Sequence, residues 1–202
     1  AKTAMWISQC QMLIETGKML GIELVGFPLL KYEQIHCADA LLCDWNKVLK
    51  RNRKNLIYIV GNPPFLGSKN KSFGKEQKES KAQAMPKAID GVKLWPNSGD
   101  LDFVCAWYAK AADYMKGFNN VETAFVSTNS ITQGEQVATL WEPLVNYYKL
   151  KIRFAWKSFR WFNKADNMAH VHCVIIGLTK NTKAQQTCSL YEVDKAPIMT
   201  NS

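Results

Sequence analysis

Apolar residues recur along the first 20 positions with the spacing of one helix face. The stripe consists of Trp6, Cys10, Leu13, Gly17 and Leu20. Intervals of three and four residues, followed by Gly21, predict a helix over residues 3–20 that ends at the glycine.

Short apolar runs and helical patterns alternate in the segment that follows. Residues 33–42 predict a strand with Asp39 at its end, and residues 45–49 predict a turn of helix. Residues 56–61 are dense in Ile and Val, which predicts a strand covered on both faces. Residues 66–99 hold seven Lys against two Glu and one Asp, with few core-forming residues. They predict a long mobile loop with room for a short helix.

The second half of the chain continues this alternation. A helix is expected from residue 101, with Asp102 near its start and Gly117 past its end. The remaining expected elements are strand 123–130, helix 131–141, strands 150–159 and 169–179, and a weak strand around 189–193. Together these elements predict an α/β fold whose sheet is largely parallel, with an antiparallel strand pair near its end.

Composition and charge narrow the classes of function. The 202 residues, 47% of them hydrophobic, are enough for one globular domain, and 26 Lys+Arg against 17 Asp+Glu give a net charge of +9. This balance favours a polyanionic partner. No membrane span or secretory signal is evident, which predicts a cytoplasmic location. The six cysteines have no zinc-ligand spacing, so we expect buried free thiols and no metal site.

In open α/β sheets, ligands gather outside the carboxyl ends of strands. By this rule the candidate positions are Asp39 and residues 62–65, 127–130 and 159–163. The sharpest signal is the sequence Asn62, Pro63, Pro64, Phe65. Two prolines stiffen the turn, so the Asn62 amide and the Pro63 carbonyl can accept both hydrogens of one exocyclic amine. Phe65 offers a face on which a base can stack, although a rigid turn with a buried Phe is the structural alternative.

The sequence IVGNPPF resembles the motif of S-adenosylmethionine-dependent amino-methyltransferases. The surrounding chain resembles the adenine-specific DNA methyltransferase domain of MmeI-type restriction-modification enzymes, through HCADAL, GNPPFLGSK, LDFVCAWYAKAA, FVSTNSITQGEQV and FAWKSFRWFNKADNMAHVHCVIIGL. The resemblance implies a Rossmann-like class I methyltransferase sheet and S-adenosyl-L-methionine as co-substrate. It also implies double-stranded DNA as partner and methyl transfer to N6 of an adenine extruded from the duplex.

The resemblance also implies roles for individual residues. The catalytic loop that grips the flipped adenine is formed by Asn62, Pro63, Pro64 and Phe65. The methyl-donor pocket is bordered by Asp39, Asp102 and Phe103, although Asp39 can instead cap a turn and Asp102 can be an ordinary helix-start residue. One aromatic residue is implied on the other face of the base, and the candidates are Phe159, Trp161 and Phe162.

Basic residues lie beside both segments expected to contact the base. Those of the Lys-rich loop are Lys69, Lys71, Lys75, Lys78 and Lys81, and those near the aromatic turn are Arg153, Lys157 and Arg160. Such residues can neutralise backbone phosphates, and the interleaved aromatic residues suit an extruded base better than a membrane. A solvated, flexible face is the alternative for the loop.

One part of the family pattern is missing. No two glycines are separated by a single residue, so the glycine-rich turn that contacts the methyl donor is absent. We therefore expect residues 1–202 to be an internal, partial catalytic domain of a larger protein with target-recognition and possibly nuclease parts. We expect the piece alone to be a poor enzyme that binds little donor. The alternatives are a non-catalytic nucleic-acid-binding remnant, or an amino-methyltransferase acting on RNA or on a protein glutamine.

Overall fold

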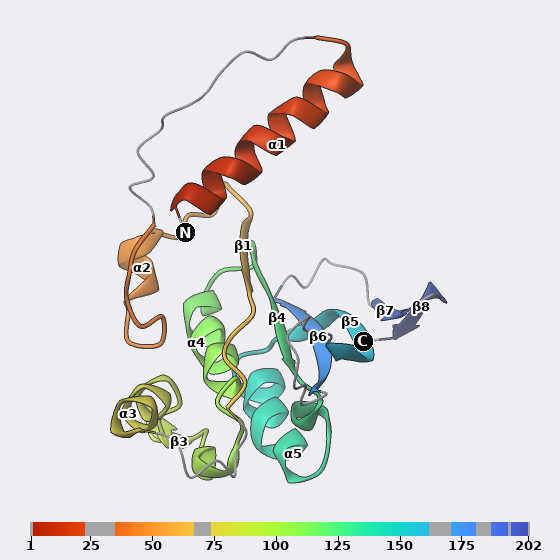
Figure 1. The fold of residues 1–202 in the computed structure, drawn as a ribbon. Coiled ribbons are helices and arrows are strands. Elements are labelled where there is room, and N and C mark those ends of the chain that lie inside the picture. Colours follow the sequence, from red (N-terminus) through yellow and green to blue (C-terminus); the bar gives the residue numbers. More distant parts are fainter. Residues whose placement is uncertain are drawn as a thin grey trace. The chain divides into compact units, whose positions relative to one another are not determined.

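The structure is a computed structural model that describes residues 2–22, 35–66, 74–161, 171–180, 187–193 and 195–201 (Figure 1). Its internal contacts divide the chain into two units, Ala1–Ala38 and Asp39–Ser202. None of the helices in these described stretches is long and apolar enough to cross a membrane.

The first unit contains helix α1 (Lys2–Leu20), which confirms the predicted helix. Its last turn ends at Gly21, whose φ of +65° is the left-handed conformation that glycine adopts easily. Gly17 is buried and Trp6 half-buried, whereas Leu20 is 63% exposed. The apolar stripe therefore fades over the last turn.

The second unit is built on a six-stranded sheet with the order β1-β4-β6-β5-β7-β8. Its strands are β1 (Ile57–Gly61), β4 (Val121–Thr128), β5 (Lys151–Trp161), β6 (Val171–Thr179), β7 (Thr187–Glu192) and β8 (Lys195–Asn201). β1, β4, β5 and β7 run in one direction, and β6 and β8 run in the opposite one. This arrangement confirms the α/β class, the prevailing parallel direction and the antiparallel pair β5/β6. Strand β8 has no counterpart among the predicted elements.

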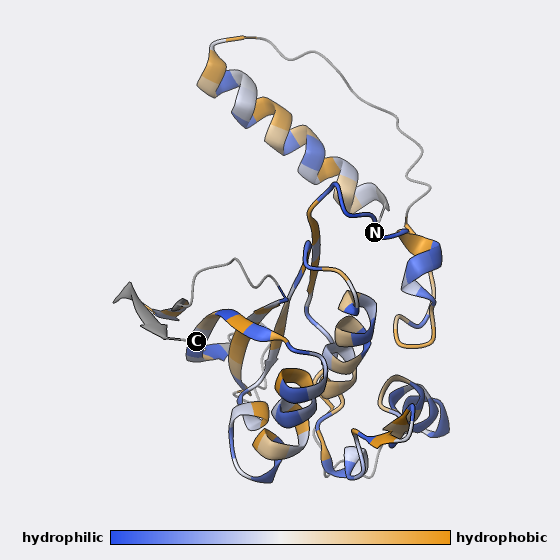
Figure 2. Cartoon of the chain, turned by 180° about the vertical axis from the view of Figure 1, so that it is seen from behind, coloured by the Kyte–Doolittle hydropathy of each residue, from blue (hydrophilic) through white to orange (hydrophobic). Residues whose placement is uncertain are grey.

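Helix α4 (Cys105–Met115) covers the sheet beside β1 and β4 (Figure 1). Its Tyr108 ring meets the Phe125 ring of β4 edge to face, with 5.2 Å between centroids. The colouring in Figure 2 is mainly hydrophobic along β1, mixed on β5 and mainly hydrophilic on α3 (Lys75–Ala84). The core thus lies between α4 and the sheet.

Helix α5 (Glu135–Glu142) starts later than its sequence pattern predicts. Residues Asn129–Thr132 form the 3-10 turn η2, and Gly134 has a φ of +59°. This left-handed residue separates the two pieces, so the predicted helix 131–141 is wrong over its first four residues. The π-helical turn η3 (Pro143–Tyr147) follows α5 directly.

The prediction of a long mobile loop over residues 66–99 is wrong for the described part, 74–99. Helix α3 is the short helix that the sequence analysis allowed within this loop. It is followed by the hairpin β2 (Ala88–Ile89) and β3 (Val92–Lys93), and by the 3-10 turn η1 (Ser98–Asp100). Asp90 and Gly91 both have positive φ, as a two-residue hairpin turn requires. Fully buried Trp95 anchors the segment.

The strand predicted over residues 33–42 is wrong for residues 35–42, which form irregular chain and, from residue 40, a turn. The Asp39 carboxylate accepts a hydrogen bond from the Leu41 N–H at 2.8 Å, and Leu41 is fully buried. The helical turn predicted next is confirmed as α2 (Trp45–Val48), whose N-cap is Asp44. Local side-chain capping therefore replaces strand pairing here.

Strand β1 is not covered on both faces, contrary to its apolar sequence. Ile57 is buried, but Tyr58 and Val60, which share the other face of the strand, are 63% and 76% exposed. The buried-thiol prediction is also only partly right. All six cysteines are free; Cys105, Cys173 and Cys188 are buried, Cys10 and Cys43 half-buried, and Cys37 exposed.

Candidate active site

Three strands end at the same edge of the sheet. β1, β4 and β5 share one direction, so their carboxyl ends lie together. Gly61 pairs in register with Phe125, and Cys173 of β6 pairs with both Thr128 and Phe159. The loop after β1, the residues after β4 and the end of β5 therefore form one rim, where ligands of open α/β sheets bind.

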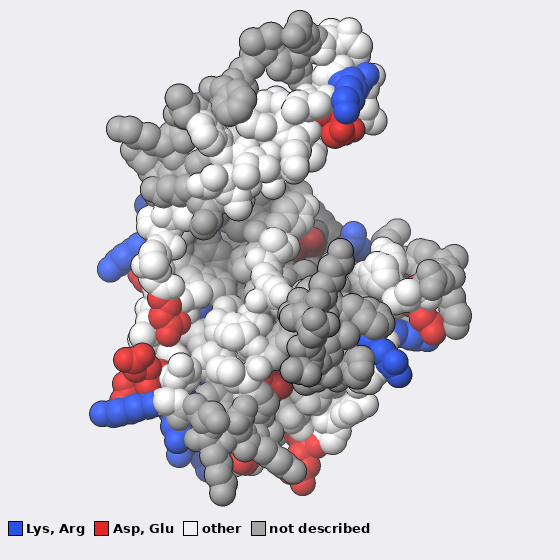
Figure 3. Space-filling view, viewed as in Figure 1, with Lys and Arg blue, Asp and Glu red and all other residues white. Residues whose placement is uncertain are grey.

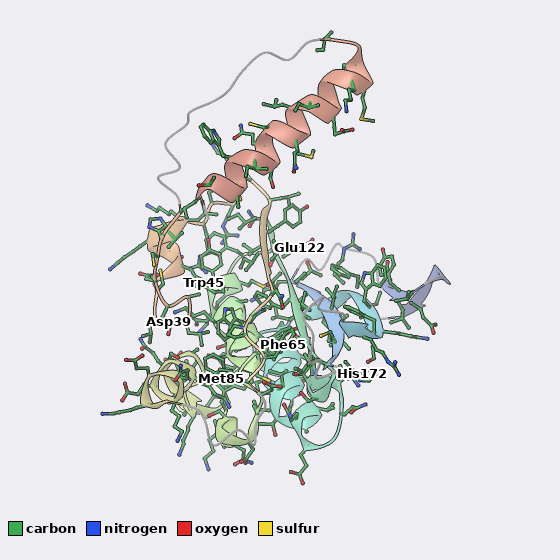
Figure 4. All side chains as sticks on the ribbon, viewed as in Figure 1. Asp39, Trp45, Phe65, Met85, Glu122 and His172 are labelled. Atoms are coloured by element: carbon green, nitrogen blue, oxygen red, sulfur yellow. The ribbon has the colours of Figure 1, made fainter. Side chains whose placement is uncertain are left out.

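The Asn-Pro-Pro-Phe loop leaves β1 at this rim. Pro63 is buried and Leu66 packs against the core, so the loop is anchored at both ends. Asn62 is exposed, and no hydrogen bond with another described residue engages its amide. Phe65 is half-buried and is labelled in Figure 4. The arrangement leaves the Asn62 amide free to bind a ligand from solvent.

A buried carboxylate lies beneath the neighbouring end of β4. Asp102 is 2% exposed, and its Oδ2 accepts the Thr128 hydroxyl at 2.6 Å and lies 3.1 Å from the Ser130 hydroxyl. The two hydroxyl oxygens are 2.7 Å apart, so the Ser130 hydroxyl can donate either to Thr128 Oγ1 or to Asp102 Oδ2. The Asp102 N–H donates to Gln136 Oε1 at 3.0 Å. The group links the start of α4 to β4 and α5.

The other carboxylate oxygen of Asp102, Oδ1, is buried and accepts no hydrogen bond from the residues that the structure describes. A buried polar atom without a partner costs about 1–3 kcal/mol, so the position of Oδ1 calls for a physical explanation. Oδ1 can accept a hydrogen bond from a hydroxyl or ammonium group of a small molecule.

The sequence led us to expect Lys81 at the surface, where it could bind phosphate. The structure instead buries it. It is 7% exposed and donates hydrogen bonds to the carbonyls of Leu101 and Gly99. Burial lowers the pKa of Lys81, and nearby Cys105 and Asp102 oppose this shift. The ammonium therefore fixes the segment that leads into Asp102, and its role is structural.

The other predicted donor-pocket residues differ in their surroundings. Asp39 is exposed and is labelled in Figure 4; one carboxylate oxygen closes its own turn, as the capping alternative expected. Phe103 is buried and meets Trp107 edge to face at 5.1 Å. Phe103 thus belongs to the packed base of the rim next to Asp102.

The aromatic and basic candidates on β5 are only partly described. Phe159 is half-buried within the paired strand, and Arg160 is exposed opposite His172. Trp161 ends β5, with only its backbone described. Phe162, Lys69 and Lys71 lie outside the described residues.

The remaining basic residues of the predicted loop lie on α3. Lys75 and Lys78 are exposed, and Lys75 Nζ lies 3.8 Å from Glu79. Figure 3 shows basic and acidic side chains interspersed where α3 lies. This mixture matches the solvated face that was the alternative for these lysines.

Sequence reasoning marked residues 127–130 by position but gave them no role. In the structure, Thr128 and Ser130 are the hydrogen-bond donors to Asp102. No sequence pattern marked Gln136, because its hydrogen bond with Asp102 joins residues far apart in the chain.

The fold and this rim define an α/β domain of the kind that binds a ligand at its carboxyl edge, and comparisons with known proteins narrow the class to methyltransferases. The family described as "MmeI, DNA-methyltransferase domain" matches residues 1–192. The chain belongs to this family.

Two relatives support the assignment. DNA methyltransferase A of Bacillus subtilis (strain 168) is 39% identical over 178 residues, which are 88% of this chain and 19% of that protein. The solved structure of the Type IIL restriction-modification enzyme MmeI in complex with DNA matches with a TM-score of 0.77 and 36% identity. That match covers 98% of this chain and 25% of MmeI. The chain thus spans about a fifth to a quarter of the length of these relatives.

Proposed function

We propose that this chain is part of the catalytic domain of a restriction-modification DNA methyltransferase that modifies the exocyclic N6 amine of adenine. The observation that carries the proposal is the exposed Asn62 amide on a loop anchored by buried Pro63. Family membership supports methyltransferase chemistry, and the net charge of +9 supports a polyanionic substrate.

The chain's own residues position and polarise the amine. The Asn62 side-chain oxygen and the Pro63 carbonyl accept its two hydrogens, which concentrates the nitrogen lone pair on the face opposite the hydrogen bonds. Phe65 stacks on the base after it leaves the duplex, a contact worth about 1–3 kcal/mol. One of Phe159, Trp161 and Phe162 covers the other face of the base. Catalysis then consists mainly of holding two reacting atoms in line.

S-adenosyl-L-methionine supplies the electrophilic methyl group when it is bound. The residues present fit this co-substrate in part. The unpartnered Oδ1 of Asp102 suits a hydroxyl or ammonium donor, and the exposed carboxylate of Asp39 suits an amino group. Phe103, the next residue in the chain, is buried against Trp107. The glycine-rich turn expected of such enzymes is not found in the sequence.

Asn62→Ala in the intact protein tests the proposal. Removing an acceptor that acts on the reacting amine should lower the rate of methyl transfer at least about 100-fold, with donor binding nearly unchanged. Transfer from tritiated S-adenosylmethionine should be measured with duplex DNA, RNA and protein offered in parallel, followed by analysis of the methylated nucleoside.

The matched control is Asn97→Ala, another exposed asparagine, which should methylate DNA at the wild-type rate. Retained transfer in Asn62→Ala would remove the assigned role. Label in RNA or protein, or on a base other than adenine, would refute the substrate instead.

A further inference from the structure

The segment that runs from α2 to the start of β1 is strongly basic and is not part of the rim described above. We name it the basic loop, with the side chains Lys47, Lys50, Arg51, Arg53 and Lys54. No acidic residue occurs between residues 45 and 56. Because β1 runs from the end of this loop to Asn62, the loop lies at the amino end of the strand. Five strand residues place it roughly 16 Å from the rim.

The basic loop is held in place by its backbone. The Asn120 side-chain amide donates to the carbonyls of Asn52 and Asn55, and the Asn52 carboxamide oxygen accepts the N–H groups of Lys54 and Asn55, each at 2.9 Å. The Tyr114 hydroxyl donates to the Leu49 carbonyl at 2.6 Å. A loop fixed by these bonds loses little conformational entropy when it binds a partner.

Arg51 has a structural part in this loop. Its guanidinium donates to the carbonyls of Tyr114 and Lys116 at the end of α4, and lies 4.5 Å from the centroid of the Phe118 ring. Arg53 lies over the same ring at 5.4 Å. Phe118 therefore holds two guanidinium groups side by side, although like charges repel.

The other cations of the loop face solvent. Lys47, Lys50, Arg53 and Lys54 are exposed, and none takes part in the ion pairs found among the described residues. This distinguishes them from the lysines of α3, where acidic residues are interspersed. Separated cations on a segment that is held by hydrogen bonds and has no acidic residue from 45 to 56 suit an extended array of phosphates, such as a DNA backbone.

We propose that the basic loop is a second DNA-binding surface, which binds backbone phosphates of the duplex away from the methylated base. The inference rests on the proposed DNA substrate. The separation from the rim exceeds the Debye length of about 8 Å at physiological salt, so the loop acts on DNA affinity and leaves the chemistry at Asn62 unchanged.

The test uses the intact protein with Lys50→Gln, Arg53→Gln and Lys54→Gln combined. The control combines Lys87→Gln, Lys93→Gln and Lys149→Gln, which removes the same charge from exposed positions elsewhere. Binding of a duplex should be measured between roughly 50 and 200 mM salt, where affinity depends steeply on phosphate neutralisation. The basic-loop variant should make the slope of log K against log[salt] shallower by about 0.9 for each phosphate that it no longer neutralises, and the control should not.

The basic-loop variant should also raise the DNA KM at least about tenfold while the rate at saturating DNA stays unchanged. Equal slopes for wild type, variant and control would overturn the inference, as would an equal decrease in both triple variants. If the slopes of wild type and basic-loop variant differ as expected but the wild-type protein methylates no DNA, only the proposed function is refuted. Failure of the DNA-binding surface and failure of the proposed function are therefore distinguishable.

Discussion

The two carboxylate oxygens of Asp102 have unequal environments. Oδ2 lies beside two hydroxyl groups, whereas Oδ1 is buried without a partner among the described residues. Core packing alone does not account for a carboxylate in this position, since an apolar side chain of similar size would avoid the desolvation cost. The asymmetry makes sense if Thr128 and Ser130 hold one oxygen so that the other faces a ligand.

Thr128→Val should therefore destabilise the protein, although the two side chains have nearly the same shape. The variant removes the 2.6 Å hydrogen bond to a buried carboxylate, and we expect the free energy of unfolding to decrease by about 1–3 kcal/mol. Urea unfolding at pH 7 measures it. Thr139→Val, at the exposed hydroxyl of a residue on α5, should change stability by no more than about 0.5 kcal/mol. Equal effects in both variants would show that Asp102 does not depend on Thr128.

Tyr108 provides a pH-dependent prediction. Burial raises the pKa of Tyr108, and its hydrogen bond with Ser127 at 2.8 Å only partly opposes the shift. The folded protein keeps a proton that the unfolded chain releases near pH 10. Its contribution to stability is therefore complete below about pH 10 and is lost as the pH rises further. Tyr108→Phe has no such proton to lose.

Free energies of unfolding should be compared at pH 8 and pH 10.5. Tyr108→Phe should lose about 1 kcal/mol at pH 8 through the missing hydrogen bond, yet lose less stability than wild type on going to the higher pH. Tyr58→Phe, at an exposed hydroxyl, is the control. An identical pH dependence for wild type and Tyr108→Phe would rule out the buried hydroxyl as a source of alkaline sensitivity.

At the scale of elements, β5 and β6 meet at a position where a side chain does not fit. Gly177 pairs with Phe154, and a Cβ on Gly177 would fall inside the contact distance of the Phe154 ring. Gly177→Ala should therefore destabilise the protein by about 1–3 kcal/mol, as overpacking does. Gly99→Ala, where a Cβ meets nothing within 4 Å, should have little effect. Similar unfolding midpoints in urea for the two variants would mean that the ring moves aside without cost.

The sequence predicted elements well where one periodicity extends over many residues. Helices α1 and α4 follow from such patterns, whereas β1 was predicted from a short run dense in Ile and Val. It failed where burial by distant residues decides, because an apolar run does not show which face of β1 is left uncovered, as at exposed Tyr58. The hairpin β2/β3 had a usable signal in Asp90-Gly91, but the segment's high lysine content concealed it.

The candidate site was predictable to a similar extent. Asn62 and Phe65 were identified because a rare local sequence follows a strand. The contacts of Asp102 with Thr128, Ser130 and Gln136 join residues 26 to 34 positions apart, so no local pattern can reveal them. The same holds for Lys81, whose charge predicted exposure and whose burial depends on carbonyls near residue 100.

At the scale of the whole molecule, the loop proposed to bind the amine is present, whereas these 202 residues contain no glycine-rich turn. The rim offers Asn62 and the unpartnered Asp102 oxygen, which suit the acceptor and one end of the methyl donor. Close approach of a backbone to a nucleotide-like ligand normally requires glycine, because any Cβ would stand in the way. No Gly-x-Gly sequence occurs in these 202 residues, so we expect them to bind the donor weakly.

Calorimetry can test this division directly. Titration of residues 1–202 with S-adenosylmethionine should give no measurable heat of binding, whereas the intact protein should bind the donor. A folded sample, verified by cooperative urea unfolding, is the necessary control, because an unfolded chain would also fail to bind. Micromolar affinity in the folded 202-residue chain would show that Asp102, Asp39 and their neighbours form a complete donor pocket without glycine. The orphaned oxygen of Asp102 would then be the first atom to test, since Asp102→Asn should weaken that binding if it accepts a hydrogen bond from the donor's ammonium group.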